Sequence, residues 1–184
     1  DYLLDQLRIA KTSTDKQNTF RTKHLNQWVG SKVAWMNMLA WQRQKDTSLK
    51  IEDFKGEQCH IALDLASKKD LTALSILFKR GEHYYGFEYF FVPEDAVLNN
   101  DRYPQFVKRD EISITGDSMT DYSFIEQKIL ELCNDYDVLS VAYDPFQATY
   151  LVARLSEHRL NLIEYGHTVG NMSEPMKLLE ACVL

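Results

Sequence analysis

Hydrophobic positions in the first fifty residues recur at the spacing of α-helices. Apolar residues three or four positions apart indicate a first helix: Leu3, Leu4, Leu7 and Ala10. The polar stretch 11–14 ends this pattern. Thr14 followed by Gln17 has the form of a capping box, which predicts a second helix that continues to Trp28. The three tryptophans, at positions 28, 35 and 41, follow one another closely and predict an apolar arm that packs against another domain.

From about Phe54 the pattern changes to alternation with a period of two. The side chains of residues 59–66 alternate between the two faces of a predicted strand, with Ile61, Leu63 and Leu65 on one face and Ala62, Asp64 and Ala66 on the other. Residues 71–79 and 83–92 predict two further strands, and the intervening residues 80–82 predict a hairpin between them. These three segments therefore predict a meander.

Helical and extended patterns alternate in the rest of the chain. The predicted segments are a short helix at 103–108, a brief strand at 112–115, a helix at 121–136, a strand at 138–143, a helix at 148–158, a strand at 161–165 and a helix at 174–184. A meander followed by helix–strand alternation predicts an α/β fold, a ribonuclease-H-like mixed sheet flanked by helices. We therefore expect a helical arm over 1–53 and a ribonuclease-H-like domain over 54–184.

Composition and charge exclude several classes of protein. The chain is 45% hydrophobic and 26% charged, which excludes disorder as a description of the whole chain, and no run approaches the roughly 18 apolar residues of a membrane span. It has no signal-peptide pattern at its start. Its formal charge of −6 argues against tight binding of nucleic acid through charge alone, although acidic residues can hold metal ions. Cys59, Cys133 and Cys182 lack metal-site spacing and predict reduced, half-buried thiols of a cytosolic protein.

Two aspartates at the expected centre of the sheet are candidates for a metal site. Asp64 lies among alanines on one face of its strand, which leaves space for a ligand. Asp144 ends the strand 138–143, where Pro145 stops the ladder. In a ribonuclease-H-like sheet these two strands are neighbours, so both carboxylates would project near one point. Two carboxylates so close together repel each other. A divalent cation relieves this repulsion, and carboxylate oxygens favour Mg²⁺ or Mn²⁺.

Each of these aspartates also has an ordinary interpretation. Aspartate at a strand end commonly caps the strand or forms a turn, and this holds still more for Asp70 in the polar turn 67–70. Lys68 and Lys69 in that turn could meet phosphates or simply be solvated. Among the five histidines, which show no metal-site grouping, His167 is the one expected near the strand ends. Residue types and spacing alone leave both the metal site and the ordinary interpretation open.

The amino-acid sequences of five segments provide a more specific signal. They are FRTKHLNQW at 20–28, AWM at 34–36 with Trp41, ALDLA at 62–66 with DLTA at 70–73, AYDP at 142–145, and GNMSEPMK at 170–177. In this order and spacing the chain resembles the large subunit of tailed-phage terminases, the DNA-packaging motors that are also common in prophages. That family joins an N-terminal packaging ATPase to a C-terminal ribonuclease-H-like nuclease, which cuts concatemeric double-stranded DNA into genome lengths.

The resemblance implies roles for three residues. Asp64 matches the metal-binding aspartate of the first strand, Asp144 matches the aspartate that ends the fourth strand, and Asp70 falls where some members place an auxiliary acid. A complete site of this kind would hold two Mg²⁺ or Mn²⁺ ions. The implied partners are double-stranded DNA, the terminase small subunit and the portal protein, in the cytoplasm of the bacterial host and away from any membrane.

The chain also departs from the family pattern. The family needs a further carboxylate from a later helix, and no aspartate follows Asp144; the remaining acids are Glu157, Glu164, Glu174 and Glu180. No G-x-x-x-x-G-K-[ST] motif occurs, so the ATPase is absent from this chain, and 1–53 is expected to be the linker arm that follows it. We expect a nuclease domain that is incomplete at its C-terminal end, with weak metal affinity. The alternatives are a non-catalytic docking module that binds portal, small subunit or DNA, and another ribonuclease-H-like nuclease such as a resolvase.

Overall fold

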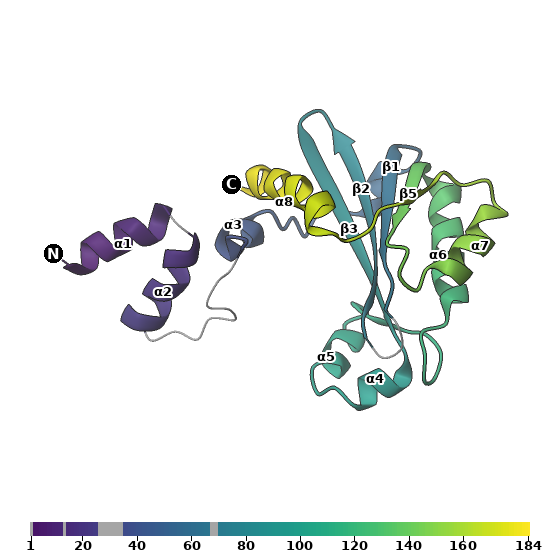
Figure 1. Cartoon of the computed structure of the whole chain (residues 1–184), viewed down its shortest axis with the longest axis horizontal. Coiled ribbons are helices and arrows are strands. Elements are labelled where there is room, and N and C mark those ends of the chain that lie inside the picture. Colours follow the sequence, from purple (N-terminus) through teal and green to yellow (C-terminus); the bar gives the residue numbers. More distant parts are fainter. Residues whose placement is uncertain (1, 13, 26–34, 67–69) are drawn as a thin grey trace. The chain divides into compact units, whose positions relative to one another are not determined.

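The computed structural model of the chain describes residues 2–12, 14–25, 35–66 and 70–184 (Figure 1). These residues divide into two units. Asp1–Ser48 together with Met172–Leu184 form the first, which we call the helical unit, and Leu49–Asn171 form the second, which we call the sheet unit. The expected domain boundary between residues 53 and 54 remains a prediction.

The helical unit is built from short helices. Its elements are α1 (Tyr2–Thr12), α2 (Thr14–His24), α3 (Met38–Arg43) and most of α8 (Val169–Val183). Asn37 caps α3, because its side-chain oxygen accepts hydrogen bonds from the backbone N–H groups of Leu39 and Ala40. The Gln44 side-chain amide donates a 3.1 Å hydrogen bond to the carbonyl of Val183, so a polar contact joins the segment after α3 to the end of α8.

Two expectations about this unit need correction. The second helix ends at His24 and does not continue to Trp28, which lies outside the described residues. The last helix begins at Val169, five residues before the expected start, and contains Pro175 in its interior. Because proline has no N–H, the carbonyl of Asn171 loses its helical partner. The hydroxyl of Tyr165 donates a 2.6 Å hydrogen bond to that carbonyl, which explains how the helix accommodates the proline.

The sheet unit contains the alternating strands and helices that the sequence indicated, together with two short helical elements that it did not. In chain order they are η1 (Ile51–Phe54), β1 (Gln58–Asp64), β2 (Thr72–Arg80), β3 (His83–Val92), α4 (Glu94–Leu98), α5 (Tyr103–Val107), β4 (Ser113–Ile114), α6 (Tyr122–Asp135), β5 (Asp137–Tyr143), α7 (Thr149–Ser156) and β6 (Leu162–Glu164). The six strands form one mixed sheet in the order β4-β3-β2-β1-β5-β6. Only β2 is antiparallel to its neighbours, so the carboxyl ends of the other five strands meet at one edge.

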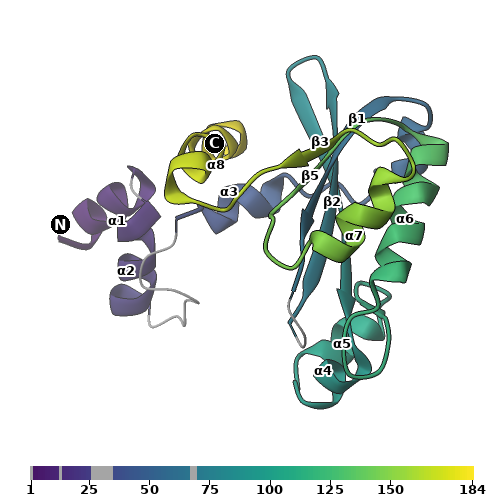
Figure 2. The ribbon, with the colours of Figure 1, turned by 45° about the vertical axis from the view of Figure 1, so that its right-hand side comes forward.

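One face of the sheet is packed against α6 and α7 (Figure 2). Ile61 and Leu63 of β1 point into this core, where they meet Ile125 of α6 and Leu151 of α7, all of them buried. The alternating residues of β1 lie on the opposite face and are exposed: His60, Ala62 and Asp64. We call this second surface the open face. The predicted alternation of the first strand is therefore confirmed.

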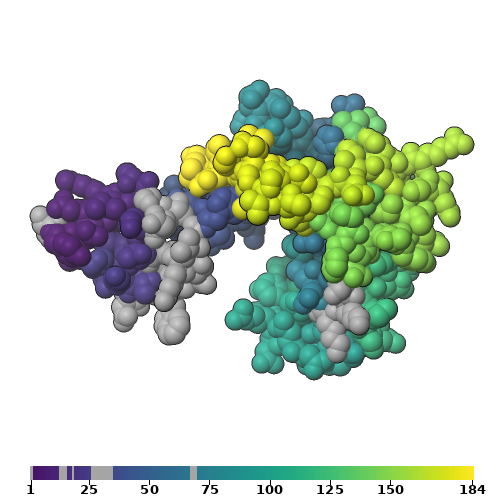
Figure 3. Space-filling view, viewed as in Figure 1, coloured from purple at the N-terminus to yellow at the C-terminus, as the bar shows by residue number. Residues whose placement is uncertain are grey.

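Two short helices, α4 and α5, lie at the carboxyl edge of the sheet. The expected helix at 103–108 is α5, but α4 directly after Pro93 was missed. Pro93 ends β3 and precedes α4, and five residues are too few for a clear helical period. The space-filling view shows this region as a bulge at one end of the sheet (teal in Figure 3).

Aromatic rings fill the part of the core beneath β2 and β3. Phe54 and Phe78 are fully buried, with ring centroids 4.7 Å apart, and Phe87 packs edge-on against Phe54 at 5.5 Å. The guanidinium of Arg80 lies 3.8 Å from the centre of the Phe54 ring and is also paired with Glu57. Phe54 and Phe78 therefore belong to the buried core, and Phe87 packs against it.

The three cysteines lie in different environments. All three cysteines are free, as predicted, but Cys182 is exposed and only Cys133 is half-buried. Burial raises the pKa of the Cys59 thiol to about 12, so this thiol stays protonated near neutral pH.

Within the described ranges, none of the helices combines the length and apolar character needed to cross a membrane.

A charged cluster joins α6 to α7. Glu126 of α6 is almost fully buried, and its carboxylate accepts a hydrogen bond from Nε of Arg154 on α7. Nε2 of His158 lies 3.6 Å from the other carboxylate oxygen. Hydrogen bonding to Arg154 lowers the pKa of the Glu126 carboxyl, because it stabilises the ionised form.

Replacing Glu126 with glutamine is expected to lower the melting temperature near neutral pH and to have less effect in acid. A carboxyl with a lowered pKa in the folded state stabilises the fold above its unfolded pKa, and this contribution is lost as the pH falls through the folded pKa. Thermal unfolding of both proteins from about pH 7 to about pH 3 should therefore show a narrowing difference. A difference that stayed constant with pH would show that the charge of Glu126 contributes nothing.

Candidate functional site

Asp64 and Asp144 leave the sheet from neighbouring strands. Asp64 is the last residue of β1, and Asp144 directly follows β5. These strands are parallel and central in the sheet, and Leu63 is the register partner of Tyr143. Because both aspartates come one residue after this pair, they lie at the same edge and on the open face. The expected juxtaposition of the two strands is therefore confirmed.

The backbone around Asp144 fixes the orientation of its carboxylate. One oxygen accepts a 2.8 Å hydrogen bond from the N–H of Phe146, and the other accepts a 2.7 Å bond from the N–H of His167. These bonds, with that of His167 first, lower the pKa of the Asp144 carboxyl. The imidazole Nδ1 of His167 lies 3.7 Å from the same oxygen, which agrees with the prediction that this histidine lies near the strand ends. Asp144 is therefore ionised and held in one position at neutral pH.

Asp64 has a different environment. It is exposed, and the described residues offer its carboxylate neither a hydrogen bond nor an ion pair. Its register partner on β2 is Ala73, and the preceding open-face residue of β1, Ala62, lies in register with Ala142 of β5. Small side chains of β1, β2 and β5 thus lie beside this carboxylate. As far as the described residues are concerned, its oxygens are available to a ligand.

The third candidate acid is not brought into a recognisable cluster. Asp70 is exposed and lies just before β2, while Lys68 and Lys69 fall outside the described residues. In the part of the chain that the structure describes, no three His, Cys, Asp or Glu side chains form a group that could hold a metal ion. The role of Asp70 therefore remains a prediction.

A later acid does not complete the site either. Glu164 ends β6 and is in register with Tyr143, so it lies on the sheet face opposite to Asp144. The residue that follows it, Tyr165, donates its backbone N–H to the carbonyl of Tyr143 at 2.8 Å and takes the position beside Asp144. In this register Glu164 does not join Asp144 on the open face.

The donor set of Asp64 and Asp144 fits a hard divalent cation in part. Mg²⁺ is commonly held by one or two carboxylates, with waters and substrate phosphates filling the other positions. Two aspartates on adjacent strands provide this minimum. A tightly bound pair of ions would require further oxygen ligands.

Two exposed aromatic side chains follow Asp144 along the chain. Phe146 is 66% exposed, and Tyr150, on α7, is 60% exposed. Tyr150 lines a cavity of about 480 Å³ together with Gln147, whose φ of 63° is unusual for a residue other than glycine. The hydroxyl of Tyr122 donates a 2.9 Å bond to the carbonyl of Ala66 and ties α6 to the segment after β1.

Comparisons with known proteins bear on this geometry. Residues 4–184 match the family model described as terminase large subunit, endonuclease domain. The chain is 34% identical to Protein YmfN of Escherichia coli (strain K12), over 100% of this chain and 43% of that protein. It is 26% identical to the terminase, large subunit, of Enterobacteria phage HK97, over 91% of this chain and 34% of that protein. The chain thus spans less than half the length of either relative.

The fold has a counterpart among solved structures. The crystal structure of the HK97 bacteriophage large terminase aligns with a TM-score of 0.67 and 24% identity, over 97% of this chain and 38% of that chain. The prediction of a ribonuclease-H-like mixed sheet flanked by helices is confirmed by this match and by the observed strand order.

Proposed function

Because the chain belongs to the family of terminase large subunit endonuclease domains, we propose that it is the DNA-cutting domain of a packaging terminase. The observation that carries this proposal is the juxtaposition of Asp64 and Asp144 at the carboxyl ends of two adjacent parallel strands. The reaction is hydrolysis of phosphodiester bonds in concatemeric double-stranded DNA during genome packaging. A water oxygen attacks phosphorus, and the sugar oxygen leaves.

Asp64 and Asp144 would hold Mg²⁺ or Mn²⁺ through their carboxylate oxygens. Such a cation supplies an activated water and stabilises the charge on the leaving oxygen. Asp144 contributes a fixed ligand, because two backbone N–H groups orient it. Asp64 contributes a ligand that is free of competing protein partners among the described residues. Asp70 would assist through a second ion or a bound water.

We expect the domain to cut with little sequence preference. In the cell the domain would work in the bacterial cytoplasm with the terminase small subunit, the portal protein and an ATPase domain.

A second candidate function is a non-catalytic docking module of the packaging machine. One observation favours it: the described residues contain no three-membered metal-binding group. In this case the fold would bind portal, small subunit or DNA without cutting. The retained pair Asp64 and Asp144 favours the nuclease.

Nicking of supercoiled plasmid in Mn²⁺ distinguishes the two functions. We expect the 184-residue chain to nick slowly or not at all, because two carboxylates hold the ion weakly. A longer version that continues into the adjoining coding sequence should nick readily, and removal of the metal with EDTA should stop the reaction. If the longer version were inert with Mg²⁺ and with Mn²⁺, the docking function would replace the nuclease.

A further inference from the structure

Strand β3 is paired unequally on its two sides. On one side β2 pairs with it continuously, from Thr72 opposite Phe91 to Arg80 opposite His83. On the other side β4 pairs with only its last two residues, Phe91 and Val92. Among the described residues, no strand lies beside His83–Phe90 on that side. We call this unpaired stretch of backbone the β3 edge.

The direction of the free hydrogen-bonding groups follows from the ladder. The carbonyl of Val92 accepts a 2.9 Å hydrogen bond from the N–H of Thr115, so Val92 faces the β4 side. Alternate residues of a strand face the same neighbour. Tyr84, Gly86 and Glu88 therefore direct their N–H and C=O groups outward along the β3 edge.

This edge lacks the usual protection against pairing. Natural edge strands commonly carry lysine, proline or a bulge that discourages a further strand. β3 contains neither lysine nor proline, and its outward-facing residues include a glycine. Tyr84, Gly86 and Glu88 are all exposed. The edge thus presents unpaired backbone groups to another strand, and Glu88 is the one carboxylate among these outward-facing residues.

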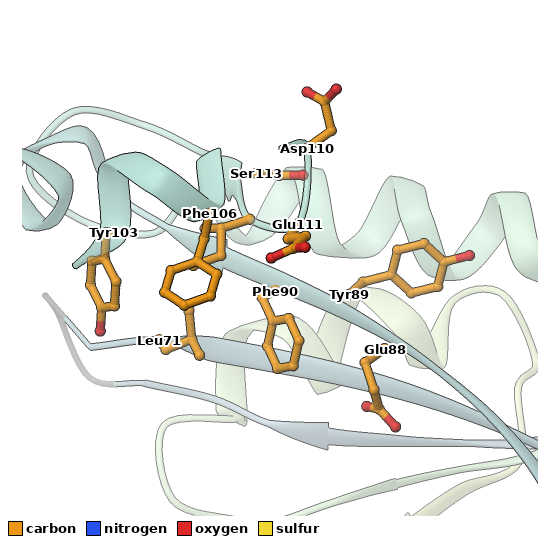
Figure 4. Close-up of a pocket in the computed structure, with 10 residues that line it drawn as sticks. Leu71, Glu88, Tyr89, Phe90, Tyr103, Phe106, Asp110, Glu111 and Ser113 are labelled. Atoms are coloured by element: carbon orange, nitrogen blue, oxygen red, sulfur yellow. The ribbon is translucent and has the colours of Figure 1, made fainter. Parts of the chain in front are cut away.

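A cavity lies where an added strand would approach β4. It has a volume of about 570 Å³, and Figure 4 shows the rings of Phe90, Phe106 and Tyr103 around it, with Leu71 below. Ser113, the first residue of β4, also lines it. A chain pairing with the β3 edge would therefore carry its side chains into an apolar, aromatic cavity.

The charges around the cavity are of one sign. Its lining includes three acidic residues, Glu88, Asp110 and Glu111, and no basic residue. Glu111 is paired with Arg109 at 2.9 Å, whereas Glu88 has only a 2.8 Å hydrogen bond from the hydroxyl of Ser75. The sheet beneath the exposed Glu88 partly desolvates its carboxyl and raises its pKa, so a cationic partner there would stabilise the ionised form.

We propose that the β3 edge binds an extended segment of a partner protein, which adds to the sheet as a strand. The segment would carry a lysine or arginine opposite Glu88 and a bulky apolar residue two positions along, in the cavity. Two residues of a strand span about 6.6 Å and return to the same face, which matches Glu88 and Phe90 on the open face. The edge, the cavity and the charge thus select one kind of ligand.

A labelled peptide tests this proposal directly. The probe is fluorescein-labelled Thr-Val-Thr-Lys-Thr-Phe-Thr-Val, and fluorescence anisotropy reports its binding to the chain. We expect saturable binding, together with slower hydrogen exchange at the amides of Tyr84, Gly86 and Glu88. Exchange that is unchanged at these amides would overturn strand addition, since adsorption by charge alone does not bury them.

Two variants of Gly86 form a matched pair. Gly86→Pro removes one outward N–H and leaves the bonds to β2 in place, so binding should weaken at least tenfold. Gly86→Ala keeps the N–H, and its added Cβ would meet Glu88 and Leu77 only at 3.6 and 3.9 Å, so binding should be retained. Equal affinities of the two variants would contradict the proposal. Melting temperatures of both establish that they fold.

A charge exchange provides a test that does not depend on proline. A peptide with glutamate in place of lysine should bind the natural chain at least tenfold more weakly. Glu88→Lys should reverse this preference. Failure of the reversal would overturn the pairing with Glu88.

Two other occupants of the edge would also overturn the proposal. Concentration-dependent dimers in sedimentation that Gly86→Pro abolishes would assign the edge to a second copy of the chain. Displacement of the peptide by an unlabelled DNA oligonucleotide would assign the cavity to nucleic acid.

Discussion

Asp64→Asn is expected to reduce metal-dependent DNA nicking by the longer protein at least about 100-fold. The substitution keeps the size of the side chain but removes one of the two negative charges that would hold the cation. Asp64 also has no described partner that needs its charge, so the fold should be unaffected. Nicking of supercoiled plasmid in Mn²⁺, with melting temperatures measured in parallel, provides the check.

A graded comparison sharpens this result. Asp144→Asn should have an effect of similar size, whereas Asp70→Asn should cost only about tenfold if its role is auxiliary. Nicking by Asp64→Asn at the unmodified rate would remove this residue from the site. A loss equally large for Asp70→Asn would instead make that residue a full ligand.

Phe78→Ala is expected to lower the free energy of unfolding by about 3–5 kcal/mol. Phe78 lies on the core side of β2, is fully buried, and packs against Phe54 at 4.7 Å and Tyr136 at 5.2 Å between ring centroids. Removing the ring loses buried apolar area and leaves a cavity that surrounding strands cannot close. Urea unfolding at constant pH, analysed with an unchanged m-value, measures the change.

An exposed phenylalanine of the same unit provides the control. Phe124 of α6 is 50% exposed, so Phe124→Ala should change the stability by no more than about 0.5 kcal/mol. Comparable losses for the two variants would mean that the ring cluster around Phe54 is not the stabilising centre of the sheet unit.

The sheet could be predicted because its patterns are local and regular. Period-two alternation from Cys59 to Leu65 determines which residues are buried, whichever strands become neighbours. The hairpin at 80–82 pairs the next two strands with little ambiguity. The missed helix α4 and the early start of α8 have another cause. Their signals are a few residues long, and Pro175 normally marks the first turn of a helix, not its interior.

The candidate site was only partly within reach of the sequence. The pairing of Asp64 and Asp144 follows from the order of elements, since that order makes β1 and β5 neighbours. The anchoring of Asp144 by the N–H of His167 depends on how the chain turns after β6, and no residue pattern encodes that turn. The resemblance to terminases was confirmed by the family match, but it left the ligand set of the metal unresolved.

The two amides that hold Asp144 have a consequence for how such sites vary between sequences. They belong to the main chain of residues 146 and 167, so any residue other than proline that preserves the path of the chain can stand at these positions. Natural variation at both positions should therefore be wide without displacing the carboxylate. A sequence search that requires particular residues at these two positions would miss related sites. A search that requires an aspartate at the end of each of two neighbouring strands would find them.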